Sequence, residues 1–240
     1  MRKWLAPLLI LTLALPACAY QLPQPANVVM GSGRLADKTY PDEGFTRLTV
    51  GNGAIVDIAR ADSYQVLVTA DDNVLEYVDA NVAGDNLRVQ LRTGNYRNIT
   101  LRVSVRMPAL RGLTLWGGAQ ARITGFRSGD PFRLDASGGS SLYGDLQAGD
   151  TTLNLSGGSS VTLRGAGQRL TITCGDGSSA SLSDYAVGDA RLTANAGCRL
   201  VVNAKGRLDV DASAGSTVRY IGSPTLGKIT QAGGAVVAPR

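Results

Sequence analysis

The sequence predicts an all-β protein built mainly as a β-helix or β-solenoid, with coils of about 18–21 residues stacked on one another. A motif recurs from Leu113 onward: two alternating apolar residues, a small-residue corner, then another apolar residue. The chain also holds 30 glycines but only three phenylalanines and two tryptophans. This composition suits a fold with many tight turns and a core of small aliphatic side chains.

The repeat length indicates stacking. The apolar residues that close the corners fall at positions 123, 142, 161, 182, 200 and 218, giving spacings of 19, 19, 21, 18 and 18 residues. A repeat this short cannot bury its own apolar row, so neighbours must stack about 4.8 Å apart and share one core. An ordinary β-sandwich is the alternative. We expect one inward column to contain Leu134, Leu153, Leu170, Leu192 and Leu208.

The chain is expected to divide into four segments. Residues 1–19 are a predicted signal peptide, residues 20–27 a tether, residues 28–107 an N-terminal β region and residues 108–238 the solenoid, continuous with that region. The N-terminal region alternates without glycine–serine corners, which predicts longer antiparallel strands that lead into and cap the solenoid.

The N-terminus carries the features of an exported bacterial envelope protein. A basic start precedes an apolar run that is too short to span a bilayer. Cleavage after Ala19 would release a soluble periplasmic or secreted protein. Leu15-Pro16-Ala17-Cys18 instead resembles a lipobox, in which Cys18 would be acylated and anchor the chain to a membrane. Both remain open, and a lipid anchor on Cys18 is the only route by which we expect the chain to contact a membrane.

The composition excludes several kinds of site. The chain has no histidine, so Ser-His-Asp and Cys-His catalytic groups and the usual histidine zinc sites are absent. Without residues 1–19, 22 basic residues face 19 acidic ones, a balance too mild for nucleic-acid binding. Gly175-Asp176-Gly177 is only a fragment of a calcium-binding repeat. We therefore expect no cofactor, no metal and no nucleic-acid partner.

Two cysteines remain after processing, Cys174 and Cys198. An oxidising compartment favours a disulfide between them. However, their positions in consecutive coils differ by two residues along the strand, which is about 6.6 Å in addition to the rise between coils. That separation is long for a disulfide, so we favour two small buried thiols.

Two surface features are candidates for binding. Arg88, Arg92, Arg102 and Arg106 share one parity on two strands that we expect to pair through the turn at Gly94-Asn95. They would form a basic stripe for anionic glycans or lipid headgroups, although a plain solvated sheet face is the interpretation that we favour. Trp116 stands at the first corner, either exposed for sugar or protein contact or capping the core.

Several ordered motifs resemble the head GIN domain of putative autotransporter adhesins. They are Gly31-Ser32-Gly33, Phe45 to Val50, Tyr64 to Asp72, Val82 to Val89, Met107 to Leu113, the glycine–serine corners and Tyr220 to Pro224. The resemblance spans about residues 28–237. It implies an exported bacterial protein of right-handed β-helical architecture, with adhesion as the function that the family name suggests.

Two functions from different classes follow. The first is a non-enzymatic envelope module for binding, adhesion or scaffolding, with an unidentified glycan or protein partner. The second is a carbohydrate-active β-helix enzyme of the polysaccharide lyase or glycosidase type, which needs two or three carboxylates in one groove. The candidate carboxylates are Asp135, Asp145, Asp150, Asp176, Asp189, Asp209 and Asp211. Their scatter favours the first function. Open solenoid ends could also stack into homo-oligomers.

Overall fold

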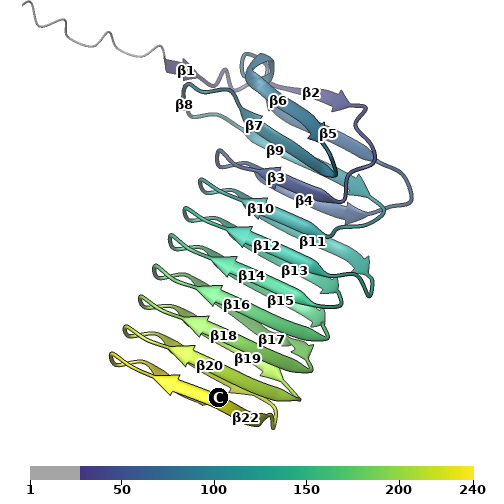
Figure 1. Cartoon of the computed structure of the whole chain (residues 1–240). Coiled ribbons are helices and arrows are strands. Elements are labelled where there is room, and N and C mark those ends of the chain that lie inside the picture. The colour runs from purple at the N-terminus through teal and green to yellow at the C-terminus, as the bar shows by residue number, and fades with distance from the viewer. Residues whose placement is uncertain (1–27) are drawn as a thin grey trace, which may run out of the picture.

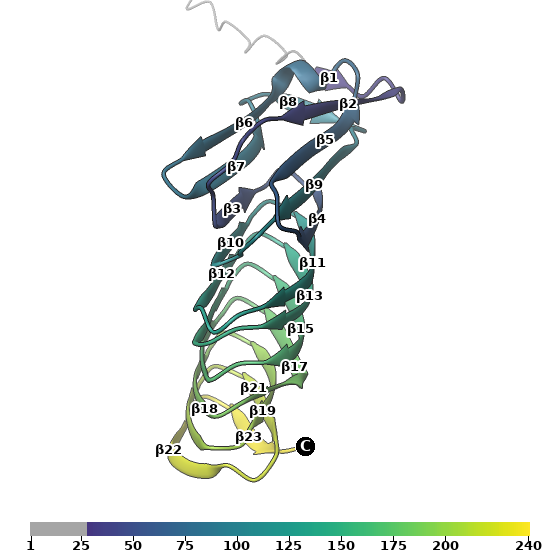
Figure 2. The same cartoon turned by 90° about the vertical axis from the view of Figure 1, so that its right-hand side faces the viewer.

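The computed structural model describes residues 28–240, which form a β-solenoid with an antiparallel cap at its N-terminal end (Figures 1 and 2). The predicted signal peptide and tether, and with them Cys18, lie outside the described residues. Each coil contributes one strand to each of two long sheets, which run along the stack. No helix within residues 28–240 is long and apolar enough to span a bilayer.

Two large sheets contain nearly all of the strands. In spatial order, sheet I is β22 (Thr225–Gln231), β20 (Arg207–Ala212), β18 (Asp189–Ala194), β16 (Arg169–Cys174), β14 (Thr151–Leu155), β12 (Phe132–Ala136), β10 (Gly112–Leu115), β3 (Arg47–Val50), β7 (Asn86–Leu91) and β6 (Val78–Ala83). Sheet II is β2 (Leu35–Tyr40), β5 (Gln65–Asp71), β9 (Leu101–Met107), β4 (Ile55–Arg60), β11 (Gln120–Arg127), β13 (Ser141–Gln147), β15 (Ser160–Ala166), β17 (Ser179–Val187), β19 (Arg199–Ala204), β21 (Thr217–Ile221) and β23 (Val236–Pro239). In addition, β1 (Val28–Met30) pairs with β8 (Asn95–Arg97), and η1 (Leu75–Tyr77) is a single 3₁₀ turn.

Aliphatic side chains from successive coils form buried columns between the two sheets. The central column of sheet I consists of Leu113, Leu134, Leu153, Ile172, Leu192 and Val210, each in register with the next. Successive members are 18 to 21 residues apart, which confirms the predicted coil length. All six are buried. The shared core that a single coil cannot supply is therefore supplied by its neighbours.

The predicted single column of five leucines is wrong in its register. Leu170 and Leu208 lie two residues away from that column, in the neighbouring inward column with Ala190. The cause is local, because β16 has three inward-facing residues, Leu170, Ile172 and Cys174. A repeat with two alternating apolar residues can be aligned either with the first two of these residues or with the last two. The architecture stands, because the second column, from Phe132 through Thr151, Leu170 and Ala190 to Leu208, is also buried between the sheets.

The corners that join sheet I to sheet II are tight turns with two successive residues at positive φ. Gly138 and Gly139 have φ of 62° and 76°, and the equivalent Ala196 and Gly197 have 47° and 74°. Positive φ at both central positions is the geometry of a type I′ turn. Glycine occupies most of these positions because it adopts positive φ without steric cost.

The first coils do not stack in chain order. The strands β7 and β9 pair in parallel with β3 and β4, and the chain then returns to place β10 and β11 on the other side of β3 and β4. The predicted hairpin between β7 and β9 is therefore wrong, because these strands belong to different sheets. Antiparallel pairing is supplied by β2 and β5 beside β9 and by β6 beside β7, and these strands form the cap.

The opposite end of the stack has a modified edge strand. In β22, Leu226 continues an inward column below Leu208, and its side chain is 51% exposed. The register between β20 and β22 shifts after Leu226, where the backbone nitrogen of Lys228 donates to Asp209. A local irregularity and an exposed lysine are devices that keep a sheet edge from pairing indiscriminately with other chains.

Candidate binding surfaces

The predicted stripe of four arginines does not exist, because its two strands lie in different sheets. Arg88 projects from β7 on the outer face of sheet I, and Arg92 directly follows that strand. Arg102 and Arg106 project from β9 on the outer face of sheet II, alternating with buried valines. The four side chains are therefore divided between two faces of the solenoid.

Sheet II carries an exposed group of one aromatic and several basic side chains that could not be identified from the sequence. Tyr143 on β13 is 37% exposed, and it lies between Arg122 of β11 and Arg164 of β15. The guanidinium carbons of Arg122 and Arg164 lie 5.6 and 5.4 Å from the centre of the tyrosine ring. Cation–π attraction at these distances holds the ring in place between two positive charges. We call this group, with Arg102 and Arg106, the arginine–tyrosine face.

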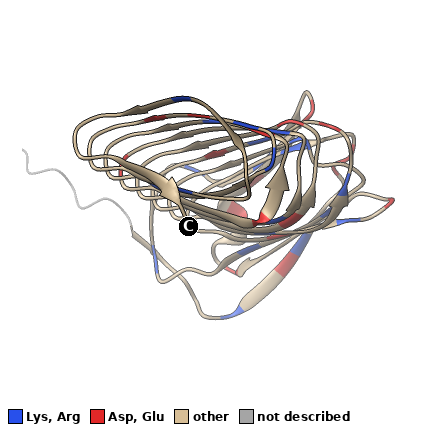
Figure 3. Ribbon diagram, turned by 90° about the horizontal axis from the view of Figure 1, so that it is seen from below, with Lys and Arg blue, Asp and Glu red and all other residues tan. Residues whose placement is uncertain are grey.

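Sheet I carries a ladder of alternating charges instead. Asp150, Arg169, Asp189 and Arg207 follow one another on successive coils. Figure 3 shows both basic and acidic segments along the stacked coils. The Arg169 Nε donates to Asp150 at 3.0 Å, and the Arg207 backbone nitrogen donates to Asp189 at 2.7 Å. With Asp209, these residues line an open hollow of about 500 Å³.

Three carboxylates therefore do meet in one hollow, which was the condition for a carbohydrate-active enzyme. Hydrogen bonds from Arg169 lower the pKa of Asp150, and hydrogen bonds from Arg207 and from the backbone of Lys228 lower the pKa of Asp209. A glycosidase needs one carboxyl group with a raised pKa to act as general acid. The arginine partners of Asp150 and Asp209 favour their ionised forms, and the ladder matches opposite charges on adjacent coils.

The other candidate aspartates lie elsewhere. Burial raises the pKa of Asp135, but hydrogen bonds from Arg133 and Asn154 leave it below its ordinary value. Asp145 is paired with Arg127 on sheet II, and Asp211 points outward from β20. Asp176 occupies a corner at φ 54°. Within residues 28–240, no three His, Cys, Asp or Glu side chains are grouped so that they could hold a metal ion.

The two cysteines form a disulfide in the structure. Cys174 ends β16, and Cys198 closes the corner before β19, in the position that Ser216 takes in the next coil. The predicted offset of two residues between the cysteines is wrong, because it assumed that both lie along straight strands. The chain reverses at the corner, which places the inward side chains of Cys174 and Cys198 side by side. The Cα atoms are 6.0 Å apart, within the range that disulfides span.

An aromatic hollow lies at the corners nearest the cap. It has a volume of about 500 Å³ and is lined by Asn52, Asp79, Gln90, Leu91, Arg92, Thr93, Gly94, Tyr96 and Trp116. The two alternatives for Trp116 both hold in part, because the side chain is half-buried against Gly51 and also lines the hollow. The other members come from separate segments, so only Trp116 could be identified from the sequence.

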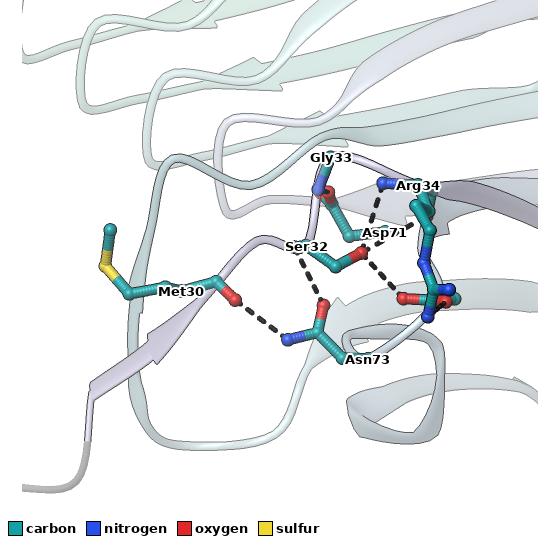
Figure 4. A network of polar contacts seen from close by, with 7 residues as sticks. Met30, Ser32, Gly33, Arg34, Asp71 and Asn73 are labelled. Atoms are coloured by element: carbon teal, nitrogen blue, oxygen red, sulfur yellow. Dashed lines mark hydrogen bonds and ion pairs between the residues drawn. The ribbon is translucent and has the colours of Figure 1, made fainter.

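The Gly31-Ser32-Gly33 motif forms a clasp between the start of the described chain and the end of β5 (Figure 4). Asp71 is buried, and its carboxylate accepts hydrogen bonds from the backbone nitrogens of Gly33 at 2.7 Å and Thr100 at 2.6 Å. The Ser32 backbone nitrogen donates to the side chain of Asn73 at 3.1 Å. A buried carboxylate satisfied by backbone donors ties three segments together, so this motif has a structural role.

Comparison with known proteins decides the family. Residues 44–224 match the family described as "Putative auto-transporter adhesin, head GIN domain", which is most of the chain. The chain belongs to this family. The resemblance inferred from the ordered motifs is thereby confirmed. No curated protein matches the chain in sequence.

Solved structures share the fold of this head GIN domain. The crystal structure of "a putative adhesin" from Bacteroides fragilis has a TM-score of 0.83 at 15% identity and covers 88% of this chain and 100% of its own. A "putative lipid binding protein" from Parabacteroides distasonis has a TM-score of 0.72 at 14% identity, with coverage of 89% and 100%. A "putative adhesin" from Parabacteroides merdae has a TM-score of 0.68 at 16% sequence identity, and the match covers 90% of this chain and 100% of that one. At these identities the likeness shows the β-solenoid fold alone.

Proposed function

We propose that this head GIN domain is an exported, non-enzymatic binding module of the bacterial cell envelope that acts in adhesion through its arginine–tyrosine face. The observation that carries the proposal is the exposed Tyr143 between Arg122 and Arg164. Tyrosine and arginine, together with tryptophan, are enriched at the energetic centres of interfaces. The family description supports adhesion as the general role.

The scaffold suits a binding surface because it is ordered before the partner arrives. Arg122, Tyr143 and Arg164 project from three adjacent parallel strands whose inward side chains are packed in the core. The backbone that carries these side chains is therefore already ordered, and little backbone entropy is lost when a partner binds. Arg164 is paired with Asp184 at 3.6 Å, and Asp57 lies in register with Arg122 on the same sheet face. Arg102, Arg106 and Arg122 form no ion pair within residues 28–240, so these three supply the unpaired positive charge of the face. The face favours an acidic protein or glycan surface.

The test is adhesion of the purified processed protein to the isolated envelope fraction of its host, measured by co-sedimentation. We expect Arg122→Ala and Tyr143→Ala each to reduce the bound fraction several-fold, and added salt to weaken binding by screening the arginines. Arg199→Ala is the matched control, because Arg199 is also an exposed arginine on the outer face of sheet II. Equal loss in the control, or no loss in the two variants, contradicts the proposal.

Export is part of the proposal and has its own test. An intact mass of the mature protein from its native host distinguishes the two forms of processing. A diacyl or triacyl mass on Cys18 supports a lipid-anchored envelope protein, and a start at Tyr20 supports a released one. A mature chain that retains residues 1–17 contradicts export by either route.

The carbohydrate-active enzyme is the second candidate, because Asp150, Asp189 and Asp209 line one hollow. Incubation with acidic and neutral polysaccharides, followed by assay of new reducing ends and unsaturated products, separates the two functions. The binding module releases neither product. Release that Asp189→Asn abolishes supports the enzyme and contradicts the proposed non-enzymatic role.

A further inference from the structure

The aromatic hollow is built by segments that are distant in the sequence. Asn52 and Trp116 come from the corners of two adjacent coils, Asp79 comes from β6, and Arg92 and Tyr96 come from the link between β7 and β9. Its volume of about 500 Å³ lies within the roughly 300–1,000 Å³ of small-ligand pockets. None of its lining residues belongs to sheet II, which carries the arginine–tyrosine face.

Trp116 breaks the repeat at this place. The register of β10 with β12 aligns Trp116 with Ser137, and later coils carry Ser156 and Gly175 at the same corner position. Stacking therefore does not require a large side chain here. The indole ring instead lies against Gly51, where an added Cβ would overlap the ring. Gly51 and Trp116 thus act together to hold an aromatic ring at the hollow.

A second aromatic ring is held in a fixed position. The Tyr96 hydroxyl donates to the backbone oxygen of Arg92 at 2.9 Å, and its ring packs beside Gly94. Tyr77 meets Tyr96 edge-on, with 5.9 Å between the ring centres. Trp116 and Tyr96 thus place two ordered aromatic rings at one hollow, and the negative face of an aromatic ring attracts the C–H groups of a ligand.

The polar groups of the hollow have balanced charge. Asp79 accepts from the Nε of Arg92 at 3.1 Å, so the one carboxylate and the one guanidinium neutralise each other. The Asn52 side-chain oxygen accepts from the Leu91 backbone nitrogen at 3.0 Å, which leaves its amide N–H groups for a ligand. Gln90 adds a second amide. The hollow therefore offers donors and acceptors without net charge.

We infer that the aromatic hollow binds a neutral saccharide, with a sugar ring against Trp116 and Tyr96 and its hydroxyl groups on Asp79, Arg92 and Asn52. A sugar ring has a C–H face and a rim of hydroxyl groups that both donate and accept, which matches these two kinds of group. Charge balance disfavours an anionic ligand. The inference goes beyond the proposed function, because it uses different residues and does not depend on the arginine–tyrosine face.

The test uses the fluorescence of Trp116, which is the single tryptophan once the segment with Trp4 is removed. The purified processed protein is titrated with maltose, cellobiose, chitobiose, mannobiose and the acidic digalacturonate, and binding is confirmed by calorimetry. We expect at least one neutral disaccharide to bind and to change the emission of Trp116. Calorimetry then compares Trp116→Ala, for which we expect affinity at least about tenfold weaker.

Two further variants keep the test decisive. Asp79→Asn preserves the shape of an exposed side chain and is expected to weaken binding several-fold even where Trp116→Ala fails to fold. Tyr143→Ala tests the arginine–tyrosine face and should leave sugar binding unchanged, so the two proposals fail separately. Binding of digalacturonate alone, full binding by both hollow variants, or no binding by any neutral disaccharide at about 10 mM overturns the inference.

Discussion

The disulfide between Cys174 and Cys198 provides the most quantitative test of the corner geometry. The perturbation is the double substitution Cys174→Ala and Cys198→Ser. It copies the next coil, because Ala194 lies in register with Cys174 and Ser216 occupies the place of Cys198. The variant should therefore keep the packing of the corner, and its loss of stability should come mainly from the missing cross-link.

The expected loss follows from the length of chain that the bond closes. With 24 residues of sequence separation, the chain-entropy relation gives about 3.5 kcal/mol at 25 °C. For a urea dependence of about 2–3 kcal/mol per molar, this shifts the midpoint by about 1–2 M. The assay is equilibrium urea unfolding of the chain from residue 20 onward, with and without dithiothreitol.

The reductant separates a cross-link from two buried thiols. Dithiothreitol should lower the midpoint of the parent chain to that of the double variant, and it should leave the variant unchanged. A parent midpoint that is the same with and without reductant would refute the reasoning, because the sulfurs would then be free thiols. A variant that unfolds far earlier than the reduced parent would show that packing, and not the cross-link, was lost.

Three further predictions concern the core, the corners and the charge ladder. Leu153→Ala removes a fully buried side chain from the central column and should lower the free energy of unfolding by about 2–5 kcal/mol. Thr152→Ala, at the outward-facing neighbour, should change it by less than about 0.5 kcal/mol; urea unfolding measures both. Ala196→Gly should stabilise the fold by about 1 kcal/mol, because alanine is held there at φ 47°; a loss would contradict the turn assignment. Hydrogen bonds from Arg207 lower the pKa of Asp209 in the folded protein below its value of about 4 in the unfolded chain. The ionised Asp209 therefore stabilises the fold fully above about pH 4, and this stabilisation is lost as the pH falls through the folded-state pKa. Asp209→Asn should therefore be less stable than the parent at pH 7, and the difference should shrink as the pH falls below about 4; a difference independent of pH would disprove the ion-pair origin.

The coil architecture could be predicted because its physical requirements repeat in the sequence. Alternating apolar residues, small corners and a spacing near 19 residues leave stacking as the way to bury each row. The register was predicted less well, since Leu170-Thr171-Ile172-Thr173-Cys174 offers two equivalent alignments. The inverted order of the first coils leaves no local sign, because parallel pairing joins strands that are far apart in the chain.

The candidate sites were predictable only in part for the same reason. Trp116 stood out because it replaces a small residue at a corner. Its partners Asn52, Asp79 and Tyr96 are ordinary residues until the fold of the first coils brings them together. The four-arginine stripe failed because it assumed a hairpin, and Tyr143 went unnoticed because its arginine neighbours lie on other coils.

The stacked register is the claim on which both binding surfaces depend, and one distance measures it directly. Thr49 on β3 and Thr230 on β22 belong to one outward column of sheet I and are separated by seven strand-to-strand steps. At about 4.8 Å per step, spin labels at these positions should be about 34 Å apart, with a narrow distribution in electron double-resonance measurements. A mean far from this value, or a distribution spread over tens of ångströms, would show that the coils do not form one continuous stack.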